Sequence, residues 1–367
     1  MPGLHDTLAM LARQKKTAAR SRKPPAPSRL VETKDFGDNP GELRMLSYRP
    51  ARLAPGAPLV VVLHGCTQTA NDYAEGAGWL TLADRYGFAV LAPEQTRQNN
   101  PNLCFNWFSP KDTARGAGEA QSICSMVARA IADNASDPAR VFVTGLSAGG
   151  AMTSVMLAAW PEVFAAGAVI AGLPYGAASN VQEAFVAMLR PGERTADDWG
   201  SRVRAASSHA GPWPRVSIWH GDADPTVRAS NADAIAAQWA NVHGLGAAVE
   251  SEDSLGHRRQ VWTAPDGATA VSLVTVRGMG HGTPLAVGGP DGCGVAGPFM
   301  IETGLSSSAE IAAFWGITAP AGRRDEPVAS PDVEATPKPV VAEVAPPKRD
   351  DRGGIVAKVL RAAGLRK

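Results

Sequence analysis

Six short runs of apolar residues recur along the middle of the chain. Runs this compact and this continuously apolar are typical of β-strands that are buried on both faces of a sheet. We therefore expect each run to form an interior strand. The runs are LVVVLHG (59–65), FAVLAPEQ (88–95), RVFVTG (140–145), AAGAVIAG (165–172), RVSIWHG (215–221) and VSLVTVRG (271–278).

Segments with the 3.6-residue spacing of helices alternate with these runs. They lie at 78–86, 117–133, 148–160 and 230–243. Regular alternation of strand and helix predicts an α/β fold, with a mostly parallel central sheet flanked by helices. Residues 178–214 interrupt this rhythm, and we expect them to form a lid or an insertion.

The two ends of the chain differ from its middle. Residues 1–39 begin with a basic stretch, and we interpret them as an N-terminal tail and lead-in. Residues 318–354 are rich in proline and charge, which is typical of a disordered linker. A short amphipathic segment follows at 355–367. The organisation predicted is one folded domain at 40–317 between two tails.

Composition narrows the classes of function. Hydrophobic residues make up 44% of the chain, and the net charge of +1 gives no argument for a nucleic-acid partner. No apolar run is long enough to predict a membrane span, and no metal-ligand spacing or cofactor motif is found. The N-terminus lacks the apolar core of a secretory signal, so the sequence by itself favours the cytoplasm. It does not indicate an oligomeric state.

The stretch VFVTGLSAGGAM (141–152) carries the first candidate chemistry. Its G-x-S-x-G pattern follows a predicted strand and precedes a predicted helix. A sharp turn of this kind lifts the serine above the sheet, and the flanking Gly145 and Gly149 avoid side-chain clashes. Ser147 is therefore the candidate nucleophile, and the N-terminus of the next helix favours developing negative charge.

A serine nucleophile needs a histidine base and an acid that orients it. In this architecture the order along the chain is serine, acid, histidine. His281 in the glycine-lined RGMGHGTP is the favoured base, with His257 as the alternative. Asp224 in WHGDADPTV is the favoured acid, with Asp222 as the alternative. Backbone N–H groups of Ala148 and Cys66 are the candidate oxyanion donors, since these residues follow the serine and an early strand.

Five motifs in combination resemble the poly(3-hydroxybutyrate) depolymerase family of esterases, which is related to feruloyl and acetylxylan esterases. The motifs are HGCTQTA, CFNWF, GLSAGGAM, HGDADPTV and GMGHGTP, and the resemblance extends from about residue 40 to 316. It implies an α/β-hydrolase fold and ester hydrolysis through an acyl-enzyme. It carries over the same catalytic residues: Ser147, Asp224 and His281.

The resemblance also implies that Cys66 and Ala148 supply the oxyanion donors and that Cys66 pairs with Cys104. The cysteine spacing alone does not establish this disulfide. Such a bond would draw the neighbouring Asn106 and Trp107 toward the site, so both are candidate residues of the substrate pocket. Packing in the core is the alternative for Trp107.

The expected function is that of a serine esterase acting on hydroxyalkanoate polymers or oligomers, or on related acyl esters. A feruloyl- or acetyl-type carboxylesterase is the alternative, and a serine peptidase or a granule-binding protein with vestigial activity is less favoured. The family resemblance implies secretion, but no signal peptide and no polymer-binding domain are recognised. These two departures disfavour attack on crystalline extracellular polymer.

Overall fold

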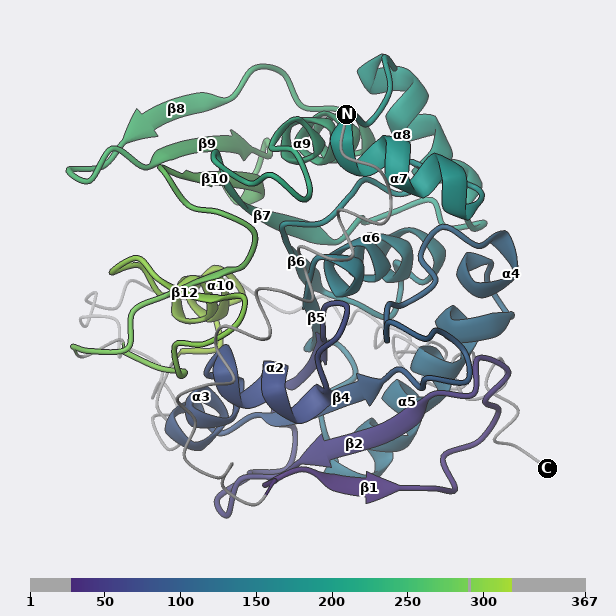
Figure 1. Cartoon of the computed structure of the whole chain (residues 1–367). Helices are drawn as coiled ribbons and strands as arrows, with labels where there is room; N and C mark the ends of the chain where they lie inside the picture. Colours follow the sequence, from purple (N-terminus) through teal and green to yellow (C-terminus); the bar gives the residue numbers. More distant parts are fainter. Residues whose placement is uncertain (1–27, 290–291, 319–367) are drawn as a thin grey trace, which may run out of the picture.

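The computed structural model describes residues 28–289 and 292–318, and most of them surround one ten-stranded sheet (Figure 1). The strand order is β1-β2-β4-β3-β5-β6-β7-β10-β9-β8, and β11 and β12 form a separate pair. The strands are β1 (Val31–Thr33), β2 (Arg44–Tyr48), β3 (Leu59–Leu63), β4 (Ala89–Glu94), β5 (Val141–Leu146), β6 (Ala166–Ile170), β7 (Arg215–Gly221), β8 (Val249–Glu252), β9 (Arg258–Thr263), β10 (Thr269–Val276), β11 (Thr283–Leu285) and β12 (Met300–Glu302).

Helices cover both faces of the sheet. They are α2 (Ala70–Gly76), α3 (Trp79–Tyr86), α4 (Pro110–Thr113), α5 (Gly118–Asn134), α6 (Ala148–Ala159), α7 (Val181–Leu189), α8 (Ala196–Ala205), α9 (Ser230–Val242) and α10 (Ser307–Phe314). The six central strands β4, β3, β5, β6, β7 and β10 are parallel. They correspond to the six apolar runs, with each end within two residues of the prediction.

Side chains of each central strand alternate between two apolar layers. In β3, Leu59, Val61 and Leu63 pack in the layer that contains α5, α6 and α9. Val60 and Val62 pack in the opposite layer, with α2, α3 and α10. Figure 1 shows these two groups of helices on opposite sides of the sheet. Because both faces are covered, the interior strands carry apolar residues at nearly every position.

The outer strands of the sheet were not predicted. Strands β1, β2, β8 and β9 pair antiparallel with their neighbours, and every residue of β8 is exposed. An edge strand in contact with solvent does not need a continuous apolar run, so the pattern has no signal there. Because β1 pairs with β2, the sheet begins earlier than the expected boundary at residue 40.

The irregular segment 178–214 lies between β6 and β7. Its helix α8 buries Trp199 and Val203 in the same layer as Trp239 of α9. The backbone of α7 accepts hydrogen bonds from Asn231 and Arg228, in the region that follows β7. The segment is therefore an insertion that joins the helical layer.

Parallel strands place all their carboxyl ends at one edge of the sheet. The loops that follow β3, β5, β7 and β10 meet there, and these loops contain the candidate residues. No helix within residues 28–289 and 292–318 has the length and apolarity needed to cross a membrane. The predicted linker at 318–354 and the segment at 355–367 lie outside the described residues from Ala319 onward, as do residues 1–27.

Candidate active site

Ser147 occupies the turn between β5 and α6. Its backbone has φ 57° and ψ −116°, a conformation that residues with a side chain seldom adopt. The Ser147 N–H donates to the carbonyl of Ile170 at 2.9 Å, which fixes the turn against β6. The side chain is half-buried at the carboxyl edge of the sheet. The sequence thus places a strained serine at the one edge where the loops converge.

Gly149 allows α6 to begin directly against the end of β3. A Cβ atom at this position would lie 2.1 Å from the carbonyl oxygen of Leu63 and 2.6 Å from that of His64. Any side chain would push the helix away from these backbone atoms. The glycine therefore sets the distance between the Ser147 turn and the loop that follows β3.

The structure brings Ser147, His281 and Asp224 into one chain of hydrogen bonds. His281 Nε2 lies 2.9 Å from Ser147 Oγ, and His281 Nδ1 lies 2.7 Å from Asp224 Oδ2. The exposed fractions of the Asp224 and His281 residues are 1% and 5%. An ionised carboxylate can only accept, so the proton of the neutral imidazole is on Nδ1 and Nε2 is free to accept from the serine hydroxyl.

The Asp224 carboxylate is held by its own loop as well as by His281. Its Oδ1 accepts from the N–H groups of Thr226 at 2.8 Å and Val227 at 3.0 Å, and His220 Nε2 lies 3.3 Å from Oδ2. Burial by itself raises the pKa of Asp224. The charge of His281 and the hydrogen bonds from His220 and His281 outweigh this effect and hold the pKa well below its ordinary value. Asp224 is therefore ionised at neutral pH.

Gly221 allows the two loops that carry the acid and the histidine to touch. A Cβ atom there would lie 2.1 Å from the carbonyl oxygen of Met279. The N–H of Ala223 donates to that same carbonyl at 3.1 Å. This backbone contact fixes the loop after β10 against the loop after β7, and so it sets the position of His281 relative to Asp224.

The alternative acid and base are engaged elsewhere. The Asp222 carboxylate accepts from the N–H of Gly278 at 2.7 Å and is exposed, so it connects the ends of β7 and β10. His257 Nδ1 accepts from the N–H of Arg277 at 3.1 Å, next to β9. Neither side chain belongs to the hydrogen-bonded chain that ends at Ser147.

The candidate oxyanion donors lie on the other side of the serine. Ala148 is the first residue of α6, where a backbone N–H has no partner within the helix. The loop after β3 packs against the serine turn, since a Cβ atom on Gly65 would lie 3.3 Å from the carbonyl of Leu146. Cys66, the next residue of this loop, forms a disulfide with Cys104. The disulfide joins the loop to the segment that carries Asn106 and Trp107.

A buried polar network supports the loop after β3. His64 Nε2 accepts from the N–H of Gln95 at 3.1 Å, so its Nδ1 carries the proton and donates to the carbonyl of Gly65 at 2.8 Å. Burial lowers the pKa of His64, in keeping with a neutral ring. The Gln95 side chain in turn donates to the carbonyl of Cys104 at 3.1 Å and to Glu119 at 2.6 Å.

Glu119 lies at the centre of this network, with an exposed fraction of 1%. Besides Gln95, its carboxylate accepts from the backbone and side-chain N–H groups of Asn106, both at 2.8 Å. The sequence did not single out Glu119 or Gln95, because a lone glutamate near the start of a helix usually faces solvent. Burial raises the pKa of Glu119 to about 8, against the hydrogen bonds, which favour the ionised form.

The two candidate pocket residues differ in their surroundings. The Asn106 side chain donates to Glu119, and its Oδ1 accepts from Asn100 at 3.0 Å, so both of its polar atoms are engaged within the protein. Asn106 therefore holds its loop. Trp107 is buried in the same apolar cluster as Ala148 and packs edge-to-face against Phe108. Within the described residues, no cluster of three or more His, Cys, Asp or Glu residues is arranged to hold a metal ion.

Glu119 should give the protein a measurable dependence of stability on pH. Between the ordinary carboxyl pKa of 4.5 and about 8, the folded protein holds a proton on Glu119 that the unfolded chain has released. The contribution of this group to stability therefore falls as pH rises through that window. In a Glu119→Gln variant this contribution disappears, and we expect its free energy of unfolding to fall less steeply with pH.

The measurement is urea unfolding of both proteins at several pH values within the window. The exchange to glutamine should also lower stability by about 1–3 kcal/mol, because buried donors lose their acceptor. A Glu193→Gln variant, changed at an exposed glutamate, should follow the wild type throughout. Parallel curves for wild type and Glu119→Gln would show that Glu119 does not titrate in this range.

Comparisons with known proteins identify the family to which the chain belongs. The family model for Esterase PHB depolymerase matches residues 45–263. Poly(3-hydroxyalkanoate) depolymerase C from Paucimonas lemoignei is 44% identical over 78% of this chain and 70% of its own length. An acetylxylan esterase from Coprinopsis cinerea is 37% identical, over 71% of this chain and 72% of its own.

Among solved structures, an acetyl xylan esterase from Aspergillus awamori aligns with 78% of this chain and 99% of its own. Its TM-score is 0.66 and its sequence identity is 27%. The predicted fold class, an α/β-hydrolase with a mostly parallel sheet between layers of helices, is confirmed. The chain belongs to the Esterase PHB depolymerase family of carboxylic ester hydrolases.

Proposed function

We propose that this chain hydrolyses ester bonds of hydroxyalkanoate polymers or oligomers through an acyl-enzyme formed on Ser147. The observation that carries the proposal is the hydrogen-bonded chain from Ser147 through His281 to Asp224. The substrate class rests on the 44% identity to a protein named as a poly(3-hydroxyalkanoate) depolymerase. Catalysis is assigned to the domain that the sequence places at 40–317, extended to include β1.

In the proposed acylation step, Ser147 Oγ attacks the carbonyl carbon of the ester while His281 Nε2 takes the hydroxyl proton. The carbonyl oxygen becomes negatively charged. Backbone N–H groups of Ala148 and Cys66 are proposed to stabilise this charge. The imidazolium then donates its proton to the alcohol oxygen as the C–O bond breaks, and the alcohol end of the substrate leaves.

Deacylation repeats these steps with water. His281 Nε2 takes a proton from the water molecule, whose oxygen attacks the acyl carbon. The tetrahedral intermediate collapses, Ser147 Oγ regains the proton, and the free acid leaves. Asp224 stays ionised throughout, because its low pKa keeps a negative charge beside the imidazolium formed in each step. The reaction needs no group other than the enzyme, the ester and water.

Acetyl or feruloyl ester hydrolysis is the second candidate function. It is favoured by the similarity of the whole fold to an acetyl xylan esterase, with a TM-score of 0.66. Both candidates share the same chemistry at the acyl carbon. They differ in the alcohol and acyl groups that the walls of the site admit, and Trp107 is the proposed aromatic residue of those walls.

A substrate panel should distinguish the two candidates. We expect kcat/KM on soluble hydroxybutyrate oligomers to exceed that on acetylated xylan oligosaccharides and on feruloyl esters. Ser147→Ala should lower every activity by about four to six orders of magnitude, because the nucleophile is lost. Its circular dichroism spectrum should be unchanged. Higher efficiency on acetylated xylan would select the second candidate, and wild-type turnover by Ser147→Ala would remove the mechanism.

The two aspartates of the acid loop provide a matched pair of variants. Asp224→Asn should lower kcat by about 10⁴-fold, because the amide no longer fixes the Nδ1–H tautomer or stabilises the imidazolium. Asp222→Asn should lower kcat by less than about tenfold, since the Asp222 carboxylate accepts from the backbone N–H of Gly278 and an amide oxygen can accept there too. Turnover of p-nitrophenyl butyrate measures both. Equal losses would contradict the assignment of Asp224 as the acid.

The two candidate histidines allow a similar comparison. His281→Ala should lower kcat by several orders of magnitude, because His281 Nε2, 2.9 Å from Ser147 Oγ, is the proposed acceptor of its proton. His257→Ala should leave kcat within about tenfold of the wild type. A larger decrease in kcat for His257→Ala than for His281→Ala would show that the base has been wrongly assigned.

A further inference from the structure

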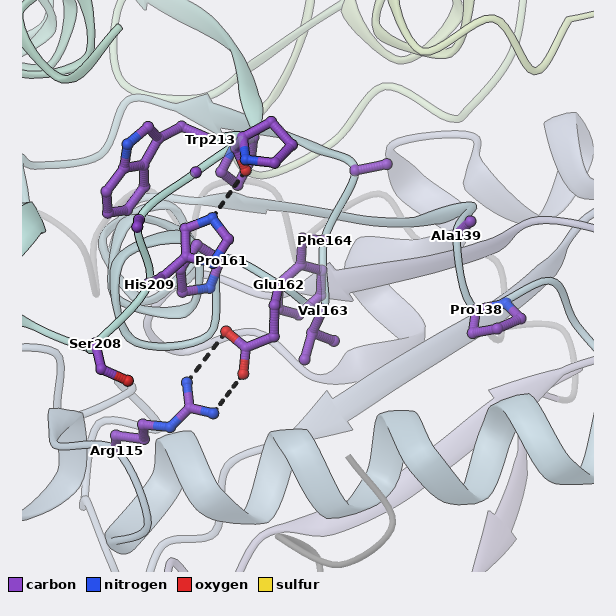
Figure 2. Close-up of a pocket in the computed structure, with 15 residues that line it drawn as sticks. Arg115, Pro138, Ala139, Pro161, Glu162, Val163, Phe164, Ser208, His209 and Trp213 are labelled. Atoms are coloured by element: carbon purple, nitrogen blue, oxygen red, sulfur yellow. Dashed lines mark hydrogen bonds and ion pairs between the residues drawn. The ribbon is translucent and has the colours of Figure 1, made fainter. Parts of the chain in front are cut away.

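A cavity of about 670 Å³ lies at the edge of the sheet opposite the candidate active site. Its walls come from the loops that precede β5, β6 and β7, at the amino ends of these strands (Figure 2). Ser147 lies at the carboxyl end of β5. Because β5 has six residues, the strand alone separates the two edges by about 20 Å. The cavity is therefore not part of the site that contains Ser147.

The cavity is lined by aromatic rings and prolines. His209 and Trp213 pack edge-to-face with their ring centres 4.9 Å apart. His209 Nε2 donates to the carbonyl of Pro212 at 2.8 Å, which fixes the loop. Figure 2 shows these two rings on one side of the view and Pro138 on the other. Grooves lined by aromatic side chains are the surfaces on which proline-rich peptides dock.

The two charged side chains in the lining, Arg115 and Glu162, already form an ion pair with each other. Arg115 donates to both carboxylate oxygens of Glu162, as the dashed lines in Figure 2 show. Its guanidinium also donates to the carbonyl of Ala159 at 2.8 Å and lies 3.9 Å from the centre of the Trp160 ring. An ionic ligand would have to break this pair. Away from this pair the lining is aromatic and proline-rich, so it fits the proline-containing stretches of a segment rather than its charged side chains.

The described part of the chain ends close to this cavity. The Arg215 guanidinium lies 4.7 Å from the ring centre of Phe314, at the end of α10. Arg215 directly follows Pro214, which lines the cavity. Trp315 stacks on Phe142, with the ring centres 5.0 Å apart. Phe142 follows Ala139 of the cavity lining by three residues in the chain. The last described residues therefore lie at the same edge of the sheet as the cavity.

We propose that this cavity binds the proline-rich segment of the same chain, residues 320–347. This segment contains seven prolines, two of them in the sequence TPKPVV (336–341). In an extended polyproline conformation of 3.1 Å per residue, the nine residues from Thr318 to Pro327 span about 28 Å, which is enough to cross the edge of the sheet. Tethering gives the segment an effective concentration on the order of 1 mM, so a weak site suffices and a free partner is outcompeted.

Proteolysis of the full-length protein tests the proposal. Glu334 and Glu343 lie within the segment, and a glutamate-specific protease cleaves them only when the segment is released. A site with a Kd of about 0.1 mM and an effective concentration of about 1 mM would slow cleavage roughly tenfold. Trp213→Ala should therefore raise the initial rate of cleavage about tenfold, while turnover of a soluble ester stays unchanged.

Trp262→Ala is the matched control, since Trp262 is also half-buried and lies in β9, outside the cavity. It should leave the cleavage rate at its wild-type value. A second variant leaves the cavity lining unchanged and alters the segment instead. In it, serine replaces four prolines together: Pro327, Pro331, Pro337 and Pro339. Hydrogen exchange of the 208–213 backbone should then become faster than in the wild type.

Equal cleavage rates for wild type and Trp213→Ala would overturn the proposal, as would unchanged exchange at 208–213 in the proline variant. If the segment becomes easier to cleave as the protein is diluted, the cavity binds the segment of a second copy. That result would also overturn the proposal. Binding within one chain is supported if resistance to cleavage is independent of protein concentration and lost in Trp213→Ala, and if slow exchange at 208–213 is lost in the proline variant. None of these measurements depends on which ester the enzyme hydrolyses.

Discussion

The buried carboxylate of Asp224 is the constraint on which the candidate site depends. A negative charge with 1% exposure costs several kcal/mol unless hydrogen-bond donors surround it. Here the donors are two backbone N–H groups of its own loop, His220 at the end of β7, and His281 from the loop after β10. Satisfying the charge therefore fixes two loops and the orientation of the imidazole at once. The hydrogen bond from Ser147 to His281 then follows from where β5 ends.

The other side of the serine is built on a different principle. The loop after β3 carries no charge of its own and is held from behind, by His64, Gln95 and Glu119 and by the disulfide to Cys104. These hydrogen bonds and the disulfide connect the loop to backbone and side-chain atoms of neighbouring segments, so the loop has little freedom to move. Rigid N–H donors are what stabilisation of an oxyanion requires, because donors that must reorganise lose much of their effect.

The sequence predicted the central strands, the main helices and the residues that meet at Ser147, because each has a local signal. Apolar runs mark buried strands, and glycines mark turns such as Gly149, where a side chain would collide with backbone. Glu119 was missed because its burial results from packing between segments far apart in the chain. The edge strands were missed because exposed strands have no apolar run. Trp213 was missed for a similar reason: it lines a cavity only because the sheet order places the loops before β5, β6 and β7 side by side.

The parallel sheet gives the two edges of the molecule different surroundings. At the carboxyl edge, the loops converge on Ser147 through backbone contacts that exclude side chains, as at Gly149 and Gly221. At the amino edge, the loops before β5, β6 and β7 stand apart and leave a cavity. A segment bound at the amino edge would be held about 20 Å from the nucleophile by the strands themselves. It would leave the carboxyl edge around Ser147 uncovered, whereas a segment folded over that edge would compete with the proposed ester substrate for the same surface.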